Sequence, residues 1–367
     1  MVLIDLQKAF DTVNHGILIE KLRAVGIDSH DWFASYLSDR SQCVEVNGTR
    51  SNFLPITCGV PQGSILGPQL FLLYINDMSI SLGCHLSLYA DDSALFFADS
   101  DPQAIARRLS AELSSCKRWL VDNKLSLHVG KTECLLFGTK SRLKRVDDFE
   151  VLCEGTAVKR VSQVKYLGVL LDCNLNFSSH VSSLLKSCMA RLSFLYRNSS
   201  FLNFQSRKTL CSSLIQPYVD YCASAWYEGL TVSLKLKLDV LQRKLVRFVH
   251  RFDCRHHVGL VELQSLSWLS IPDRVKYFSL VHLFRIKRGL APHYLRVNIA
   301  SVSDTHAHNT RGSNSNFHVS KSMSHMPSSF AFSGVRHWNG LPASLKSIDS
   351  LVIFKRELRK YLLSSYG

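Results

Sequence analysis

Two adjacent carboxylates, Asp91 and Asp92, separate two apolar segments that predict strands, Leu86–Leu88 before them and Ala94–Ala98 after them. Two carboxylates at one tight turn repel each other, and a divalent cation that ligates both of them removes the repulsion. The pattern is therefore typical of a site that holds metal for nucleotidyl transfer. Taken alone, such a pair is more often only a solvated turn, because Asp is a favoured turn residue.

A third acid strengthens the metal interpretation. Asp5 is the one charged residue of the apolar stretch Val2–Leu6, which predicts a short buried strand. A lone carboxylate in such a strand is costly unless it is paired or bound to metal. We therefore expect Asp5, Asp91 and Asp92 to act together.

Two further segments carry polar groups with a constrained backbone. Cys58–Pro68 contains three glycines and two prolines, which predicts a rigid, irregular loop in which glycine lets the backbone approach a ligand closely. Lys131–Glu133 follows a predicted helix and opens a strand.

In order and spacing, these segments resemble the palm motifs of reverse transcriptases. The phrasing of Ala9–His15 and of the Gly59–Pro68 loop is most similar to the non-LTR (LINE-type) retrotransposons of the jockey and chicken-repeat branch. The five motifs cover roughly the first half of the chain, and Arg336–Pro342 with Phe354–Lys355 looks more loosely like the C-terminal tails of such elements.

The resemblance implies an RNA-directed DNA polymerase that uses two Mg²⁺ ions about 4 Å apart, with Mn²⁺ as a substitute. Asp5 and Asp91 would be direct ligands, Asp92 would complete the acidic site, and the backbone carbonyl of Leu6 would be a further ligand. The partners implied are an RNA template, a DNA primer and dNTPs.

The resemblance also implies roles around the metals. Phe10 would exclude a ribose 2′-hydroxyl, Gln62 and Gly63 would contact the incoming nucleotide and template, Lys131 would protonate the leaving pyrophosphate, and Tyr166–Gly168 would grip the primer end. Taken without the family, Phe10 is ordinary core, Pro-Gln-Gly is a turn and Lys131 is a solvated lysine. The family usually has Asn where this chain has His128.

Charge is distributed unevenly along the 367 residues, whose net charge is +15. Residues 1–177 carry 18 Lys and Arg against 20 Asp and Glu, a balance of −2, whereas residues 178–367 carry 26 against 9, a balance of +17. A basic second half suits a polyanionic partner, although a basic soluble surface is the alternative. The amphipathic stretch Leu234–Phe252 is the clearest candidate for following a phosphate backbone.

Periodicity predicts an α+β chain. Residues 1–177 would form a reverse transcriptase palm, a split βαβ with an antiparallel sheet and helices on one face, including a helix from Pro102 to Asp122. Residues 178–298 would be a helical, basic, thumb-like region, 299–329 a Ser/His/Asn-rich linker and 330–367 a tail region.

The eleven cysteines are scattered without a Cys-x-x-Cys pair, which favours free thiols and no disulfide-linked partner. A metal site at His250, Cys254, His256 and His257 is the weaker interpretation of that cluster, because a second cysteine pair is absent. No apolar run approaches the length of a membrane span. We expect an intracellular protein of cytoplasm and nucleus.

Met1 lies four residues before Asp5, so the fingers region expected of a reverse transcriptase has no counterpart ahead of the motifs. The sequence therefore predicts a fragment of a retrotransposon reading frame. Its alternative is a catalytically inactive nucleic-acid-binding remnant, and a weaker one is an RNA-templated RNA polymerase, against which Phe10 and Tyr89–Asp92 argue.

Overall fold

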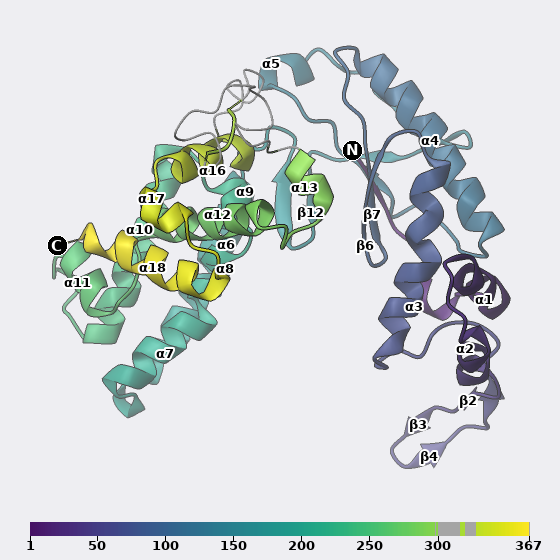
Figure 1. Ribbon diagram of the computed structural model, residues 1–367, viewed down its shortest axis with the longest axis horizontal. Coiled ribbons are helices and arrows are strands. Elements are labelled where there is room, and N and C mark those ends of the chain that lie inside the picture. The colour runs from purple at the N-terminus through teal and green to yellow at the C-terminus, as the bar shows by residue number, and fades with distance from the viewer. Residues whose placement is uncertain (298, 300–315, 320–327, 367) are drawn as a thin grey trace. The chain divides into compact units, whose positions relative to one another are not determined.

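The computed structural model describes residues 1–297, 299, 316–319 and 328–366, and divides into two compact units (Figure 1). The first unit comprises Met1–Gly168 with Asp172–Asn174, and the second comprises Val169–Leu171 with Leu175–Gly367. Residues 330–366 belong to the second unit and do not form a compact unit of their own. The linker predicted at 299–329 lies mostly outside the described residues.

The first unit contains short strands and helices in alternation. Its helical elements are η1 (Ala9–Asp11), α1 (His15–Ala24), α2 (His30–Leu37), α3 (Leu66–Ile75), η2 (Asn76–Ser81), α4 (Pro102–Asp122) and α5 (Lys140–Leu143). Its strands are β1 (Val2–Ile4), β2 (Ser41–Gln42), β3 (Glu45–Val46), β4 (Thr49–Arg50), β5 (Leu54–Pro55), β6 (His85–Tyr89), β7 (Asp92–Phe96), β8 (Glu133–Cys134), β9 (Leu152–Cys153), β10 (Thr156–Ala157), β11 (Lys159–Arg160) and β12 (Gln163–Tyr166), and β13 (Val169–Asp172) runs across the boundary between the units.

A five-stranded sheet with the order β11-β8-β1-β7-β6 organises this unit. β1 pairs antiparallel with β7 on one side and with β8 on the other, and β6 and β7 form an antiparallel hairpin. β11 pairs parallel with β8. The sheet is therefore mixed, and the prediction of a wholly antiparallel sheet was wrong, because the chain returns to this edge after the β9–β10 hairpin and joins it in the same direction as β8.

One face of this sheet packs into the core. Val2, Ile4 and Leu95 are at most 4% exposed and share a hydrophobic cluster with residues of α3 and α4. Because side chains alternate along a strand, Leu3 and Asp5 point to the opposite face. The helices thus cover one face, and the other receives the acidic residues.

The long helix α4 spans the residues predicted for it. The Asp101 side chain accepts from the backbone N–H groups of Gln103 and Ala104, and Pro102 occupies the first turn, where its missing N–H costs nothing. Apolar residues at helical spacing, Ile105, Leu109, Leu113, Cys116 and Leu120, are buried along one stripe. The sequence also predicts a helix that opens at Pro68. The structure begins this helix, α3, at Leu66, because the Ser64 hydroxyl accepts from the Gly67 N–H and starts it earlier.

The Asn47-Gly48 turn closes a hairpin as its sequence predicts, with positive φ at both residues. The sequence predicts that this turn joins strands at Cys43–Val46 and Phe53–Cys58, but it joins the short strands β3 and β4. The second predicted strand contains β5, which pairs with β2 instead. Val46 and Phe53 are both more than 60% exposed. This hairpin therefore lies outside the core of the unit.

The second unit is helical. Its elements are α6 (Ser178–Arg197), η3 (Ser199–Phe201), α7 (Phe204–Leu214), α8 (Gln216–Asp220), α9 (Ala223–Trp226), α10 (Val232–His250), α11 (Leu260–Ser265), α12 (Ile271–Lys287), α13 (His293–Val297), α16 (Phe330–Asn339), α17 (Ala343–Lys346) and α18 (Leu351–Ser364).

α12 forms the centre of the second unit, where it packs against α9, α16 and α18 (Figure 1). Phe284 of α12 stacks on Phe354 of α18 with ring centroids 4.4 Å apart, and Trp338 of α16 lies 5.9 Å from Phe354. All three rings are buried. The C-terminal helices therefore complete the core of this unit.

Among the described residues, no helix combines the length and apolar character needed to cross a bilayer.

Candidate functional site

The register of the central strands brings the acidic residues together. β1 and β7 pair through Leu3↔Ala94 and Ile4↔Ser93, so the next residue of each strand, Asp5 and Asp92, lie opposite each other. Directly opposed residues of an antiparallel pair share a face, with Cβ atoms about 5 Å apart. Residues 87 positions apart in the sequence thus meet at one edge of the sheet.

Asp91 occupies the two-residue turn between β6 and β7. Tyr89 pairs with Asp92, and the intervening Ala90 has a φ of 53°. Burial, and then the negative charges of Asp91 and Asp5, raise the pKa of the Asp92 carboxyl above its usual value. The electrostatics agree with the register: Asp91 and Asp5 are both near enough to Asp92 to repel its charge.

The Leu6 carbonyl takes no part in the pairing with the segment around Leu127. Leu6 bridges Leu127, with bonds from Gln7 N–H to Ser126 O and from His128 N–H to Asp5 O, both 2.9 Å or shorter. Neither bond uses the Leu6 carbonyl, because in this pairing it points to the other edge of the strand. That edge is the one from which β1 pairs with β7.

The donor set suits a hard divalent cation, since carboxylate and carbonyl oxygens are its preferred ligands. The mutual repulsion at Asp92 is what such an ion would relieve. In the described part of the chain, no three His, Cys, Asp or Glu side chains converge closely enough to hold an ion between them. The three acids therefore offer suitable ligand atoms, but within the described residues the structure does not gather them into a closed metal site.

Phe10 lies within η1 and is only partly buried. Its ring packs on Phe71 of α3 with the centroids 4.4 Å apart. Phe71 is fully buried. The Phe10 ring therefore has a fixed position at the border of the core, five residues after Asp5.

The glycine-rich loop is joined to the segment that follows Asp5. Gly59 N–H donates to Val13 O at 2.7 Å and Val60 N–H donates to Phe10 O at 2.8 Å. Gly59 has a φ of +89°, and a Cβ there would lie 2.7 Å from Asp11 O. Only glycine permits this close approach, so the two loops form one rigid support.

Gln62 is exposed, and its amide Nε2 donates to the Asp11 carboxylate at 2.7 Å. Gly63 has a φ of +80° with open space where a Cβ would stand. Gln62 lines a cleft of about 680 Å³, which is also lined by Lys8, Asp11 and Arg40, and Gly63 is the next residue along the chain. The sequence analysis does not predict a role for Lys8, Asp11 or Arg40. Lys8 and Asp11 lie close to Asp5 in the sequence, which is the one local signal that could have identified them.

Lys131 lies in an exposed turn that replaces strand pairing beside Asp5. The pairing shifts from Leu6↔Leu127 to Leu3↔Glu133, so residues 128–132 form a loop opposite Ile4 and Asp5. Lys131 N–H donates to His128 O at 3.0 Å. Within the described residues its ammonium group has no hydrogen-bond or ion-pair partner.

Tyr166 reaches the face of the sheet that carries the acids. Its hydroxyl donates to Ser87 Oγ at 3.1 Å, and Ser87 is paired with Ala94, two residues beyond Asp92 on the same face. Leu167 and Gly168 follow with φ values of 44° and 83°, as a tight two-residue turn requires. Tyr89 is 66% exposed, so it stands free of the core beside the acids.

The basic helix predicted at Leu234–Phe252 is α10, but its cations are less free than its sequence suggests. Lys235 pairs with Glu228, Arg247 donates to His256 O, and Arg251 donates to the carbonyls of Ser199 and Leu202. Leu236, expected on the apolar stripe, is 53% exposed. The surface of α10 is therefore mixed, and only part of it is available for phosphates.

The His250–His257 cluster also has local partners. His250 Nε2 is hydrogen-bonded to Ser265 Oγ at 3.2 Å, and the His256 ring stacks on Phe252 with centroids 3.9 Å apart. The sequence favours the basic end of a helix over a metal site here, and these contacts agree with that interpretation.

Comparison with known families finds a match in the first half of the chain. Residues 1–171 match the family described as reverse transcriptase (RNA-dependent DNA polymerase). The match contains the three acids, the glycine-rich loop, Lys131 and Tyr166. Divalent metals such as Mg²⁺, an RNA template, a DNA primer and dNTPs are what this family generally uses.

Curated relatives extend the similarity beyond that region. The chain is 28% identical over 305 residues to a probable RNA-directed DNA polymerase from transposon BS of Drosophila melanogaster, covering 78% of this chain and 33% of the relative. It is 27% identical to the RNA-directed DNA polymerase from mobile element jockey of the same fly, covering 66% and 27%. It is also 28% identical to a probable RNA-directed DNA polymerase from transposon X-element of Drosophila melanogaster, covering 67% of this chain and 28% of the relative. The chain thus spans about a third or less of these relatives.

Proposed function

We propose that this chain synthesises DNA on an RNA template, because residues 1–171 match the reverse transcriptase family and its relatives are named as RNA-directed DNA polymerases of mobile elements. The observation that carries the proposal is the register that sets Asp5 opposite Asp92, with Asp91 in the adjoining turn. In this proposal the first unit is a palm and the second a thumb-like region. We propose that the protein acts in the cytoplasm and nucleus, where RNA and chromosomal DNA occur.

We propose that Asp5, Asp91 and Asp92, with the Leu6 carbonyl, hold two Mg²⁺ ions. When bound, the ions would activate the primer 3′-hydroxyl and neutralise the leaving pyrophosphate. The part of the protein is to keep these oxygens on one sheet edge, and the raised pKa of Asp92 supports their proximity.

The residues proposed to recognise the incoming nucleotide lie on the glycine-rich loop and on the segment that follows Asp5. The Phe10 ring, fixed against Phe71, would occupy the space of a 2′-hydroxyl and favour deoxynucleotides. Gln62 and Gly63 would contact the nucleotide and template from the cleft rim, with the Gln62 amide oriented by Asp11.

Proton transfer and primer placement involve residues on either side of the acids. The free ammonium of Lys131, in the loop opposite Asp5, would donate a proton to pyrophosphate as it leaves, an effect typically worth about 10²-fold or more. Tyr166, anchored to Ser87 on the same face as Asp92, would position the primer end.

Primer extension tests the proposal. The purified full chain is given an RNA template, a DNA primer, Mg²⁺ and dNTPs, with Asp91→Asn as the inactive control. We expect extension by the wild type alone. Wild-type extension no greater than that of Asp91→Asn, together with retained RNA binding, would instead favour the inactive nucleic-acid-binding remnant.

Metal binding gives a readout besides activity. Mg²⁺ or Mn²⁺ should raise the unfolding temperature of the wild type, because a ligand that binds the folded state stabilises it. The rise should be absent in Asp91→Asn and retained in Asp349→Asn, a matched change at an exposed acid of the second unit that pairs with Arg288. A metal-dependent rise equal in all three proteins would contradict the ligand assignment.

A further inference from the structure

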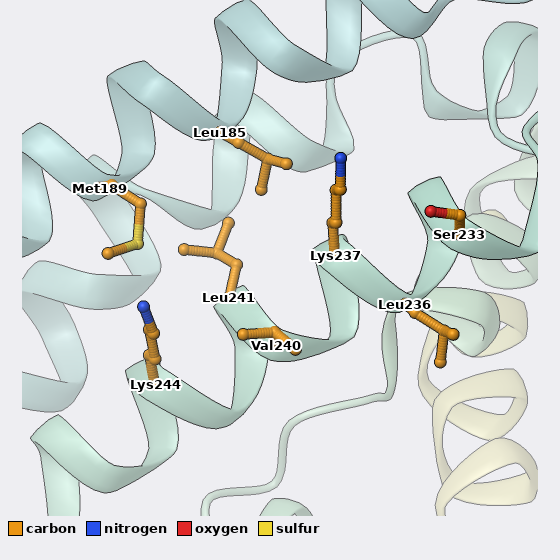
Figure 2. Close-up of a pocket in the computed structure, with 8 residues that line it drawn as sticks. All are labelled: Leu185, Met189, Ser233, Leu236, Lys237, Val240, Leu241 and Lys244. Atoms are coloured by element: carbon orange, nitrogen blue, oxygen red, sulfur yellow. The ribbon is translucent and has the colours of Figure 1, made fainter. Parts of the chain in front are cut away.

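A groove of about 470 Å³ lies between α6 and α10 of the second unit (Figure 2). Its floor is apolar: Leu185 and Met189 of α6 face Leu241 and Val240 of α10. Val240 is 46% exposed, and the neighbouring Leu236 is 53% exposed. Exposed aliphatic side chains gathered along a groove between helices are typical of a surface that binds a partner.

Two lysines flank this floor. Figure 2 shows Lys237 and Lys244 extending from α10 toward α6, one on each side of Leu241. They are seven residues apart on one helix, which separates their Cα atoms by about 10.5 Å along its axis. Neither ammonium group has a hydrogen-bond or ion-pair partner among the described residues, so both are free to meet an acidic group.

The apolar floor argues against a phosphate backbone as the occupant. Interfaces with nucleic acid are more polar and more positively charged than those between proteins, and a phosphate backbone offers little apolar surface to match aliphatic side chains. The stretch Leu234–Phe252 contains six Lys and Arg residues. Three of them, Lys235, Arg247 and Arg251, are bonded within the protein and lie outside the groove. What remains is an apolar strip with two isolated positive charges.

We propose that this groove binds an amphipathic α-helix of a protein partner, with aliphatic residues on its inner face and acidic residues along its edge. Helix-in-groove recognition uses anchors at positions i, i+3 or i+4, and i+7, and two acids seven residues apart would match the spacing of Lys237 and Lys244. Met189, with its flexible unbranched chain, can adapt the floor to the anchors. This inference is independent of the polymerase activity.

Direct binding by the full chain tests this proposal. The probe is a fluorescein-labelled helical peptide with leucines at positions i, i+4, i+7 and i+11, and with glutamates seven residues apart beside them. We expect saturable binding by fluorescence anisotropy. The double variant Lys237→Glu, Lys244→Glu should weaken it by about tenfold or more, because two flanking ion pairs become repulsions. Val240→Asp should abolish it.

Matched controls separate the groove from general charge. Lys355→Glu changes the same charge on α18, away from the groove, and should leave peptide binding within about twofold, as an exposed charge distant from the contact would. In the wild type, a peptide with lysines replacing the glutamates should bind about tenfold more weakly. Circular dichroism of each variant establishes that it is folded.

Two outcomes overturn the proposal. One is peptide binding that Val240→Asp leaves unchanged, which would place the contact elsewhere. The other is an RNA–DNA duplex that competes for the groove and loses affinity on the double lysine change as much as the peptide does. That result would assign the groove to nucleic acid.

Discussion

The two units of this chain use charge in opposite ways. In the first unit, the carboxylates of Asp5, Asp91 and Asp92 lie at one edge of the sheet. Burial, and then the negative charges of Asp91 and Asp5, raise the pKa of Asp92. In the second, cations are spread along helices, and many of them bond to nearby carbonyls or acids. Like charges that lie close together without neutralising partners are typical of a site that binds an ion of the opposite charge. Charges that are spread out and bonded to local partners mainly stabilise the structure.

The largest effect should come from breaking the acidic cluster. Asp5→Asn is expected to lower primer extension about a thousandfold, because metal coordination is worth several kcal/mol in the transition state. Asp349→Asn, the same chemical change in the second unit, should leave extension unchanged. Equal losses from both changes would mean that charge alone, and not the position of Asp5, matters.

The second unit should respond to loss of packing more than to loss of charge. Trp338→Ala removes a ring that is 1% exposed, and is expected to cost about 3–5 kcal/mol in the free energy of unfolding. Urea unfolding measures this. Phe201→Ala, at a ring that is 88% exposed, is the control and should cost less than about 0.5 kcal/mol. Similar costs for the two would contradict the core described around Phe354.

A smaller effect should separate the packing role of Phe10 from its proposed role as a gate. Phe10→Val is expected to reduce discrimination against ribonucleotides by about 10- to 100-fold, since a smaller side chain leaves room for the 2′-hydroxyl. The ratio of kcat/KM for dNTP and rNTP measures it. Phe71→Leu disturbs the same contact from the core side and should alter stability without changing the ratio. If both changes alter the ratio equally, Phe10 acts only through packing.

The smallest effect concerns the dependence of stability on pH. The Asp92 pKa is raised above its ordinary value of 3.8, so the folded state binds this proton more tightly than the unfolded state does. Its contribution to stability is therefore present below the unfolded pKa and is lost as pH rises through the folded one. Thermal unfolding of Asp92→Asn should lack this decline. A difference from wild type that grows as pH falls would reverse the sign and contradict the repulsion.

Local signals in the sequence identified much of the first unit. Asp101-Pro102 at a helix start, followed by apolar residues at helical spacing, fixed α4 at both ends, and the Asn47-Gly48 pair fixed a hairpin turn. The parallel pairing of β11 with β8 could not be predicted, because both strands have two residues and their partners lie far apart in the chain. The earlier start of α3 depended on a single side-chain hydrogen bond from Gly67 to Ser64.

The candidate site divides in the same way. The types of Asp5, Asp91, Asp92 and Lys131 were evident from the sequence, since each interrupts a pattern that would otherwise be apolar or ordinary. The Gln62–Asp11 bond, the anchoring of Tyr166 on Ser87 and the cleft residue Arg40 were not. These depend on loops that meet in space, and no local periodicity records such a meeting.

By itself the sequence indicated which residues are candidates for chemistry, where the long helix α4 begins and ends, and that the second half is basic. Those properties follow from residue type and short-range spacing. Only the tertiary structure decided that Asp5 faces Asp92, because strand register is set by the pairing of distant segments. It likewise decided that α10 presents an apolar groove between two lysines, because the packing of α6 beside it determines which side chains remain exposed.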